Sequence, residues 1–224
     1  MLPHAEARAA LAASYLKGQA PNSLALLPAP PAAGSAAQAR DDAAARAAQA
    51  MRNSPRWKQA VQDANLKFPD VAETFACAAG VEISATTTPA LYGMLERTMA
   101  DIGLSTYPTK NKFQRTRPFV VTSTPTCTPD EEAFLRKDGS YPSGHSAIGW
   151  GWALIIAEAA PDRADAVLER GRAFGQSRVV CNVHWLSDTE EGRMIAAATV
   201  ARVHGEPELR SDLGAAAREI AAAR

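Results

Sequence analysis

The sequence predicts an all-α protein in which a single domain holds a bundle of several helices. Aromatic residues make up 6% of the 224 residues, alanine is abundant and runs of β-branched residues are short. This composition favours helices over sheets. Apolar residues recur at three- and four-residue intervals in most segments, which is the period of a helix with one buried face. A chain of this length can bury one full core.

The first 34 residues differ from the rest of the chain in composition. Leu11, Tyr15 and Leu16 stand at helical spacing and predict a short helix near the N-terminus. The prolines of residues 19–34 favour an extended strap on the surface, although its leucines could instead line a pocket. We therefore divide the chain into an N-terminal helix and proline-rich strap, residues 1–34, and a helical domain, residues 35–224.

Helix signals are frequent between residues 35 and 103. Ser54 is a suitable N-cap, and Pro55 suits the first turn of a helix. Gly80 is expected to end a helix as its C-cap residue, and Gly103 to end another. The helices expected in this part span residues 35–51, start at Pro55, span residues 71–79 and run from residue 89 to 103.

A long apolar run dominates the second half of the chain. Residues 107–137 contain basic and turn-forming residues and are expected to be the least regular part. The run Ala147–Ala160 predicts a buried core helix, with Ser143 as its N-cap. The remaining expectations are two helices within residues 161–202, with a bend near Gly175 or Cys181-Asn182, and a surface helix over residues 207–224.

The charge balance excludes some classes of partner. The chain has 24 Lys plus Arg and 24 Asp plus Glu, so its net charge is zero. General binders of nucleic acid or of membrane surfaces usually carry a basic excess, so we expect neither partner. No stretch reaches the length of a transmembrane span, and residues 1–30 lack the pattern of a signal peptide. Any anion site must therefore be local.

The three cysteines are Cys77, Cys127 and Cys181, which allow at most one disulfide within the chain and leave one thiol over. Whether a disulfide forms is left open by the sequence. The cysteines have no CxxC spacing and few histidines nearby, so we expect no zinc site. Nothing in the sequence resembles a carboxylate-rich metal cage, so we expect no other metal site either.

The stretch Asp138–His145 stands immediately before the apolar run. Glycines and a proline break regular structure here, and a hydroxyl, a bare backbone and an imidazole arrive together at the start of the predicted core helix. Free backbone N–H groups at a helix N-terminus are a natural seat for an anion. The alternative is an ordinary capped helix whose histidine is structural.

Three groups of residues carry the candidate chemistry. Each has a plain alternative when taken alone: solvated surface charges, a structural histidine, or a salt bridge. The groups are Lys110 with Arg117-Pro118, then Pro142-Ser143-Gly144-His145, and then Arg178, His184 and Asp188.

In this order and spacing the three groups resemble the signature of the type 2 phosphatidic acid phosphatase superfamily: Lys-x6-Arg-Pro, Pro-Ser-Gly-His and Arg-x5-His-x3-Asp. The flanking residues, including Asp138–Tyr141, Ser177–Cys181 and Trp185–Ser187, are similar to those of the soluble bacterial class A non-specific acid phosphatases. The resemblance covers roughly residues 26–202. It implies the all-α fold of that kind and metal-independent hydrolysis of small phosphate monoesters without a cofactor. It also implies a periplasmic or secreted location and a homodimer.

The resemblance assigns the reacting groups. His184 is expected to attack phosphorus through Nε2 and form a phosphohistidine, and His145 to protonate the leaving group. If His184 and Asp188 share a helix, they lie one turn apart, and Asp188 can accept the Nδ1–H and fix the tautomer. Water then hydrolyses the intermediate, with His145 acting as the base.

The remaining signature residues are expected to bind phosphate. Lys110, Arg117 and Arg178 would supply cationic donors, and Ser143 Oγ with the backbone N–H of Gly144 would complete the cradle. On an ideal helix Arg178 and His184 are about 240° apart, so either the helix breaks between them or the arginine reaches round. Lys112 and Arg115 lie outside the signature and are expected to be exposed at the pocket mouth.

Two alternatives share the same cradle. One is a vanadium-dependent haloperoxidase, in which vanadate takes the place of phosphate. The other is a non-catalytic member that only binds phosphate. Transfer of the phosphoryl group to an alcohol instead of water is allowed by the same intermediate.

Overall fold

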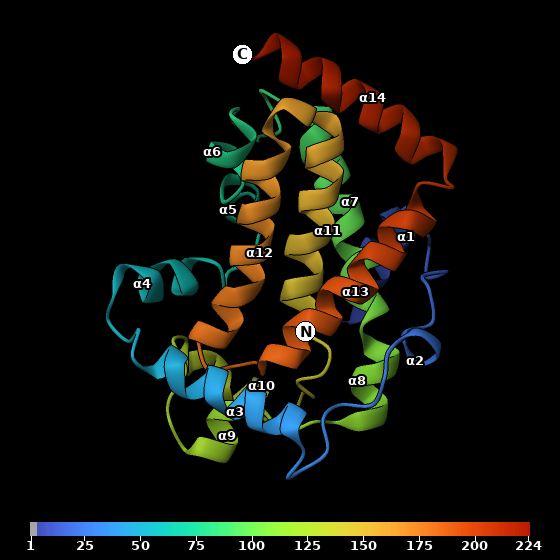
Figure 1. Ribbon diagram of the computed structural model, residues 1–224. Helices are drawn as coiled ribbons and strands as arrows, with labels where there is room; N and C mark the ends of the chain where they lie inside the picture. Colours follow the sequence, from blue (N-terminus) through green and yellow to red (C-terminus); the bar gives the residue numbers. More distant parts are fainter. Residues whose placement is uncertain (1–3) are drawn as a thin grey trace.

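The structure is a computed structural model that describes residues 4–224, and the backbone in that range forms helices and loops without a strand (Figure 1). The predicted all-α class is therefore confirmed. The helices are α1 His4–Ala13, α2 Ser23–Leu26, α3 Ala36–Gln49, α4 Pro55–Gln62, α5 Asp70–Glu73, α6 Ala76–Ala79, α7 Pro89–Ser105, α8 Tyr107–Phe113, α9 Pro118–Thr122, α10 Glu132–Leu135, α11 Gly144–Ala159, α12 Ala164–Val180, α13 Leu186–Val203 and α14 Pro207–Ala222, with single 3₁₀ turns at Pro129–Glu131 and Pro161–Arg163.

Helix α11 is the centre of the bundle and packs against α7, α12, α13 and α14. Its apolar run was expected to be buried, and Trp152, Ile155 and Ile156 are fully enclosed. The Trp152 ring lies edge-on to Phe75, and its Nε1–H donates to the Leu95 carbonyl at 3.0 Å. The hydrophobic effect therefore fixes this helix in the middle of the molecule.

Helices α11 and α12 approach each other closely because glycines stand at the contact. A Cβ atom at Gly171 would lie 2.3 Å from the Cβ of Ala153 and 2.8 Å from the carbonyl oxygen of Gly149. No side chain fits at that distance, so glycine is required there. The close contact fixes the middle of α11 relative to the middle of α12.

The two ends of the bundle are covered differently (Figure 1). Helix α14 lies across the end where α11 finishes, whereas α3, α8, α9 and α10 gather at the end where α11 begins and α12 passes into α13. The short helices α8, α9 and α10 occupy the segment that we expected to be least regular. They leave enough loop between them to bring several chain segments to one place.

Three predicted helix starts are confirmed by a capping side chain. The hydroxyls of Ser35, Ser54 and Ser143 each accept a backbone N–H from the first turn of α3, α4 and α11. Gly80 ends α6 in the left-handed conformation, with φ of 72°. These capping residues act through local chemistry, which is why the sequence reveals them.

Two helix boundaries differ from the prediction. Helix α7 continues through Gly103 to Ser105, where the hydroxyls of Ser105 and Thr106 bond back to the carbonyls of residues 102 and 103. The range 71–79 holds two short helices, α5 and α6, instead of one.

Residues 1–3 of the predicted N-terminal helix lie outside the described residues. Helix α1 occupies His4–Ala13, so Tyr15 and Leu16, which helped to predict it, follow the helix instead of belonging to it. The strap then crosses the bundle surface: Leu27 is buried, and the Pro28 carbonyl accepts the Tyr141 hydroxyl at 2.8 Å. The division of the chain at residue 34 stays a prediction. In the described part of the chain, no helix combines the length and the apolar character needed to cross a membrane.

Candidate active site

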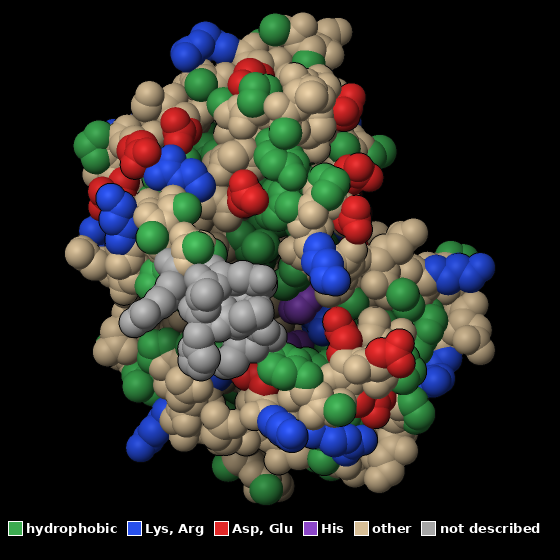
Figure 2. All heavy atoms as spheres, turned by 180° about the vertical axis from the view of Figure 1, so that it is seen from behind, with side chains coloured by type: hydrophobic (Ala, Val, Ile, Leu, Met, Phe, Trp, Pro, Cys, Tyr) green, Lys and Arg blue, Asp and Glu red, His purple; other side chains and the backbone are tan. Residues whose placement is uncertain are grey.

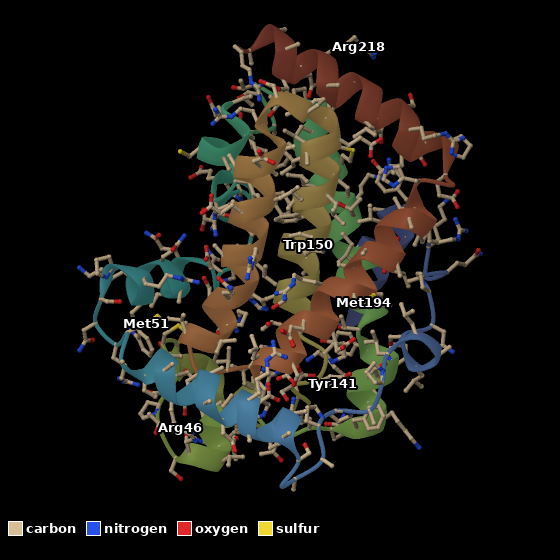
Figure 3. The ribbon with its side chains drawn as sticks, in the orientation of Figure 1. Arg46, Met51, Tyr141, Trp150, Met194 and Arg218 are labelled. Atoms are coloured by element: carbon tan, nitrogen blue, oxygen red, sulfur yellow. A yellow bond between two sulfur atoms is a disulfide. The ribbon has the colours of Figure 1, made fainter. Side chains whose placement is uncertain are left out.

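The signature residues come from three segments that meet at the end of the bundle where α11 begins. The first segment holds Lys110 in α8 and Arg117 just before α9, and the second is the loop before α11, with Ser143. The third segment runs from the end of α12, with Arg178, to the start of α13, with Asp188. Tyr141, in the loop before α11, lies at this end of the molecule, whereas Trp150 lies farther along α11 (Figure 3). The structure thus brings together residues that are up to 78 positions apart, from Lys110 to Asp188.

The chain breaks between α12 and α13, which answers the question of how Arg178 and His184 can share a site. Helix α12 ends at Val180, and Asn182 has a positive φ of 64°. The backbone N–H groups of Val183 and His184 both donate to the Arg178 carbonyl, at 3.1 and 3.2 Å. This tight turn brings His184 back beside the end of α12.

His184 precedes α13, so His184 and Asp188 do not share a helix, and the condition for the one-turn spacing is not met. Asp188 is the third residue of α13, and its Oδ2 accepts the Trp185 backbone N–H at 2.8 Å, as an N-terminal capping carboxylate does. The same oxygen lies 3.3 Å from His184 Nδ1. The predicted contact is present, but a helix cap produces it.

The hydrogen bonds of His184 define its tautomer. Arg117 Nη1 lies 3.1 Å from His184 Nε2, and a guanidinium can only donate. Nε2 is therefore the acceptor, and the proton resides on Nδ1, facing Asp188. Burial, Arg117 and Lys110 hold the pKa of His184 well below its usual value, so the imidazole is neutral with a lone pair on Nε2.

Lys110 and Arg117 share a carboxylate that the sequence analysis did not select. Asp138 Oδ2 accepts Arg117 Nη2 at 2.9 Å and lies 3.4 Å from Lys110 Nζ. Lys110 also donates to the Gly139 carbonyl at 2.5 Å. Burial and the neighbouring Arg117 lower the pKa of Lys110 to about 8. The sequence places Asp138 at the start of the stretch Asp138–His145 but predicts no role for it, because an acidic residue beside an anion site runs against the simple charge argument.

Arg178 is the clearest sign of a missing anionic partner. Its side chain is 1% exposed, yet Nε and Nη1 have no hydrogen-bond partner among the described residues. Burial, with Arg117 adding to it, lowers its pKa to about 10, which still leaves it charged. A buried charge without partners is costly, so this guanidinium suits a bound anion such as phosphate.

The start of α11 presents further donors. Ser143 Oγ accepts both the backbone N–H and the hydroxyl of Ser146, at 3.2 and 2.9 Å, which leaves its own proton free to donate. Gly144 is the first residue of α11, and a Cβ atom there would meet only Thr106 Oγ1, at 3.8 Å. The protein itself does not require glycine at this position, which agrees with close approach of a ligand to the backbone.

His145 lies beside this cradle, on the first turn of α11. Its Nε2 donates to the Ala64 carbonyl at 2.9 Å, so Nδ1 is the nitrogen left to exchange a proton. Burial and the positive charge of Arg178 lower the pKa of His145 well below its usual value. On the back of the molecule, histidine side chains are visible within a hollow, beside basic and acidic ones (Figure 2).

Arg115 is not exposed at the pocket mouth, which corrects our expectation, whereas Lys112 is exposed. The Arg115 side chain is 9% exposed, and Nη1 donates to Asp188 Oδ1 at 2.7 Å. Its Nη2 donates to Asp41 Oδ2 of α3, also at 2.7 Å. Sequence reasoning missed both contacts, because nothing local connects residues 41, 115 and 188.

One disulfide closes beside the site. Cys127 is bonded to Cys181, which caps α12 between Arg178 and His184, and Cys77 is free and exposed. The Phe119 backbone N–H also donates to the Asn182 carbonyl. The segment 119–127 is thereby attached to the turn that carries His184. Among the described residues, no group of three or more His, Cys, Asp or Glu side chains lies together as a metal site would require.

Comparison with known proteins gives consistent results. The PAP2 superfamily model matches residues 90–206. An acid phosphatase of Zymomonas mobilis is 42% identical over 199 residues, covering 87% of this chain and 74% of that protein. A non-specific acid phosphatase of Providencia stuartii is 42% identical over 209 residues, covering 92% of this chain and 84% of that protein. A non-specific acid phosphatase of Salmonella typhimurium is 40% identical over 200 residues, covering 89% of this chain and 80% of that protein.

These similarities extend over the whole bundle, including α3 and the strap, which lie outside the superfamily match. The three groups of signature residues come together in one buried, cationic place. The chain belongs to the PAP2 superfamily and, within it, to the family of bacterial class A non-specific acid phosphatases.

Proposed function

We propose that this protein hydrolyses small phosphate monoesters of broad scope, with no metal ion or cofactor, through a phosphohistidine at His184. The observation that carries the proposal is the guanidinium of Arg178, whose Nε and Nη1 have no hydrogen-bond partner in the described part of the chain. It lies in the same buried place as a histidine whose Nε2 holds a lone pair. The names of the relatives, acid phosphatase and non-specific acid phosphatase, support the same reaction.

Substrate binding would use the cationic donors. The phosphate oxygens accept hydrogen bonds from Arg178, Lys110 and Arg117, and from Ser143 Oγ and the Gly144 N–H. In the free protein, an N–H of Arg117 donates to His184 Nε2. When substrate binds, this N–H would donate to a phosphate oxygen instead, which frees the lone pair of Nε2 for attack. Phosphoryl transfer places charge on the equatorial oxygens, which these donors stabilise.

The first step forms the bond between His184 Nε2 and phosphorus while the bond to the leaving oxygen breaks. Asp188 holds the Nδ1 proton and balances the positive charge that develops on the ring. His145 gives its Nδ1 proton to the leaving oxygen. The doubly negative phosphate offsets Arg178 and raises the pKa of His145 from its low value in the free site, which favours the protonated form in acid.

The second step releases phosphate. His145, now neutral, accepts a proton from water, and the water oxygen attacks phosphorus. The bond to Nε2 breaks, and the electron pair returns to His184. An alcohol in place of water would give phosphotransfer by the same path.

The test is His184→Ala, with Asp188→Asn beside it. His184→Ala should abolish hydrolysis of p-nitrophenyl phosphate while far-UV circular dichroism and the melting temperature stay close to those of the original protein. An alkaline quench should trap labelled phosphate on the original protein, and it should trap none on the His184→Ala variant. Activity near normal in His184→Ala, or full loss of activity on chelation, contradicts the proposal. Oxidation of bromide with vanadate and peroxide, without phosphatase activity, would favour the haloperoxidase alternative.

The location and assembly are proposals as well. The disulfide Cys127–Cys181 supports a periplasmic or secreted location, because disulfides persist in oxidising compartments. A homodimer is proposed from the family resemblance and can be checked by light scattering after gel filtration. Nucleic acids and membranes are not proposed as partners, since the net charge is zero.

A further inference from the structure

Arg115 lies outside the family signature, but its side chain contacts Asp188 on the side away from His184. Its guanidinium donates four hydrogen bonds of 2.7–2.8 Å: Nη1 to Asp188 Oδ1 and Ser187 Oγ, and Nη2 to Asp41 Oδ2 and Gln38 Oε1. It also lies over the Trp185 ring, with 5.4 Å from its central carbon to the ring centroid. A surface charge that only attracts substrate would not be held in this way.

Asp41 holds Arg115 from the opposite side. It belongs to α3 and is fully buried, and its two oxygens also accept the backbone N–H and the hydroxyl of Ser187, at 2.8 and 2.6 Å. Ser187 is the second residue of α13, next to Asp188. Helix α3 is therefore attached to the first turn of α13 at the position of the carboxylate that contacts His184.

We infer that Arg115 is a positioning residue for His184, acting through Asp188, and that Asp41 of α3 holds Arg115 in place. The inference rests on the proposed role of His184 as nucleophile. It describes a chain of side chains, Asp41–Arg115–Asp188–His184, in which charges alternate up to the neutral imidazole.

The geometry explains why Arg115 is needed. Asp188 Oδ2 serves the Trp185 N–H and His184 Nδ1, whereas Oδ1 is held by Arg115. With Oδ1 fixed, the carboxylate cannot rotate away from the imidazole. Without Arg115, that orientation would depend on the weaker 3.3 Å contact and one backbone N–H.

The charged groups around Asp188 also support a role for Arg115. The groups that face Asp188 are Arg115, His184, Lys110, Arg117 and Tyr141. Arg115 is the one Lys or Arg in direct contact with it among the described residues. Burial raises the pKa of Asp188, and Arg115 opposes that rise. Asp41 adds a second negative charge beside Arg115, which Arg115 shares with Asp188.

The experiment compares Arg115→Met, Arg115→Lys and Asp41→Asn by kcat for p-nitrophenyl phosphate as a function of pH. Arg40→Met is the matched control, because Arg40 also joins α3 to α13, through Glu190, but is 60% exposed. We expect Arg115→Met to lower kcat about 10- to 100-fold, as loss of a supporting partner commonly does. We expect its low-pH limb to move up by about one pH unit, because a cation within contact distance lowers a carboxylate pKa by that order.

The other variants separate charge from packing. Arg115→Lys keeps the charge, so its low-pH limb should stay close to that of the original protein. Asp41→Asn removes a negative charge, so its limb should move down, opposite to Arg115→Met. A side chain that only supports the fold would shift neither limb, and Arg40→Met should shift neither. Unchanged limbs in both Arg115→Met and Asp41→Asn, or shifts in the same direction, overturn the inference.

Failure of the inference differs from failure of the proposed function. If His184 is the nucleophile, Arg115→Met still traps phosphate on His184, at a lower rate, and His184→Ala traps none. If Arg115→Met does not fold, the direction of the limb in Asp41→Asn decides alone. Nitrogen NMR of His184 gives an independent readout: Arg115→Met should lose the single Nδ1–H tautomer, whereas Arg40→Met should keep it.

Discussion

The two halves of α11 contrast sharply in what surrounds them. The half from Trp152 to Ala159 is enclosed by apolar side chains, including Phe75 and Leu95. The half that begins at Ser143 faces buried charges, among them Arg178 and Asp188. Apolar packing tolerates small changes of angle, whereas hydrogen bonds between charged groups depend on distance and direction. One half thus holds the fold together, and the other holds atoms in place for chemistry.

The largest expected effect is at Arg178, where stability and activity should separate. Arg178→Met should lower kcat/KM for p-nitrophenyl phosphate about 10³-fold, since an arginine that stabilises a phosphoryl transition state is worth that order. The melting temperature should stay equal or rise, because an apolar chain replaces a buried charge whose Nε and Nη1 have no partner within residues 4–224. A large fall in melting temperature would mean that Arg178 supports the fold.

The opposite separation is expected at Trp152. Trp152→Ala should reduce the free energy of unfolding by about 3–5 kcal/mol, the usual cost of emptying a buried aromatic site. Activity per folded molecule, measured at low temperature, should stay near normal. Trp152→Phe is the control and should lose less stability, because it keeps a ring in contact with Phe75 while losing the bond to Leu95. Equal loss of activity and stability would break the contrast between the two halves.

Two glycines of the bundle sharpen the contrast further. Gly144→Ala should lower kcat/KM about tenfold, which is roughly the effect of losing one charge-assisted hydrogen bond. It should not lower stability, because the protein leaves room for a Cβ atom there. Gly171→Ala should instead cost about 1–3 kcal/mol of stability through overpacking, with activity per folded molecule retained. The measurements are urea unfolding and initial rates on the same preparations. Loss of stability in Gly144→Ala would show that the protein, and not a ligand, requires glycine there.

The smallest effect is a pH limb from Lys110. Its pKa is lowered to about 8, so kcat/KM should decline as pH rises through 8 and the cation is lost. The free energy of unfolding should change with pH in the opposite direction to kcat/KM. Between pH 8 and the ordinary lysine value of about 10.4, the unfolded chain binds the proton more than the folded one, so stability rises with pH. Lys110→Met should remove the alkaline limb, whereas Lys112→Met, the exposed control, should leave it.

The sequence predicted the parts that depend on local chemistry. Ser54 and Ser143 were identified as caps because their hydroxyls bond to N–H groups within the same turn. The buried helix α11 was identified because its apolar run has no other place in a compact domain. Gly103 was predicted as a helix end and is not one, because α7 continues to Ser105 and the hydroxyls of Ser105 and Thr106 bond back to the last carbonyls of the helix.

By itself, the sequence determined the helical class, the family and the set of signature residues, because composition, spacing and caps are properties of neighbouring positions. Only the tertiary structure decided that Cys127 pairs with Cys181, that Asp138 joins Lys110 to Arg117, and that Arg115 faces inward. Those contacts join segments that are distant in the chain. Their distances and directions exist only after the bundle has packed, which is why no pattern in the sequence could reveal them.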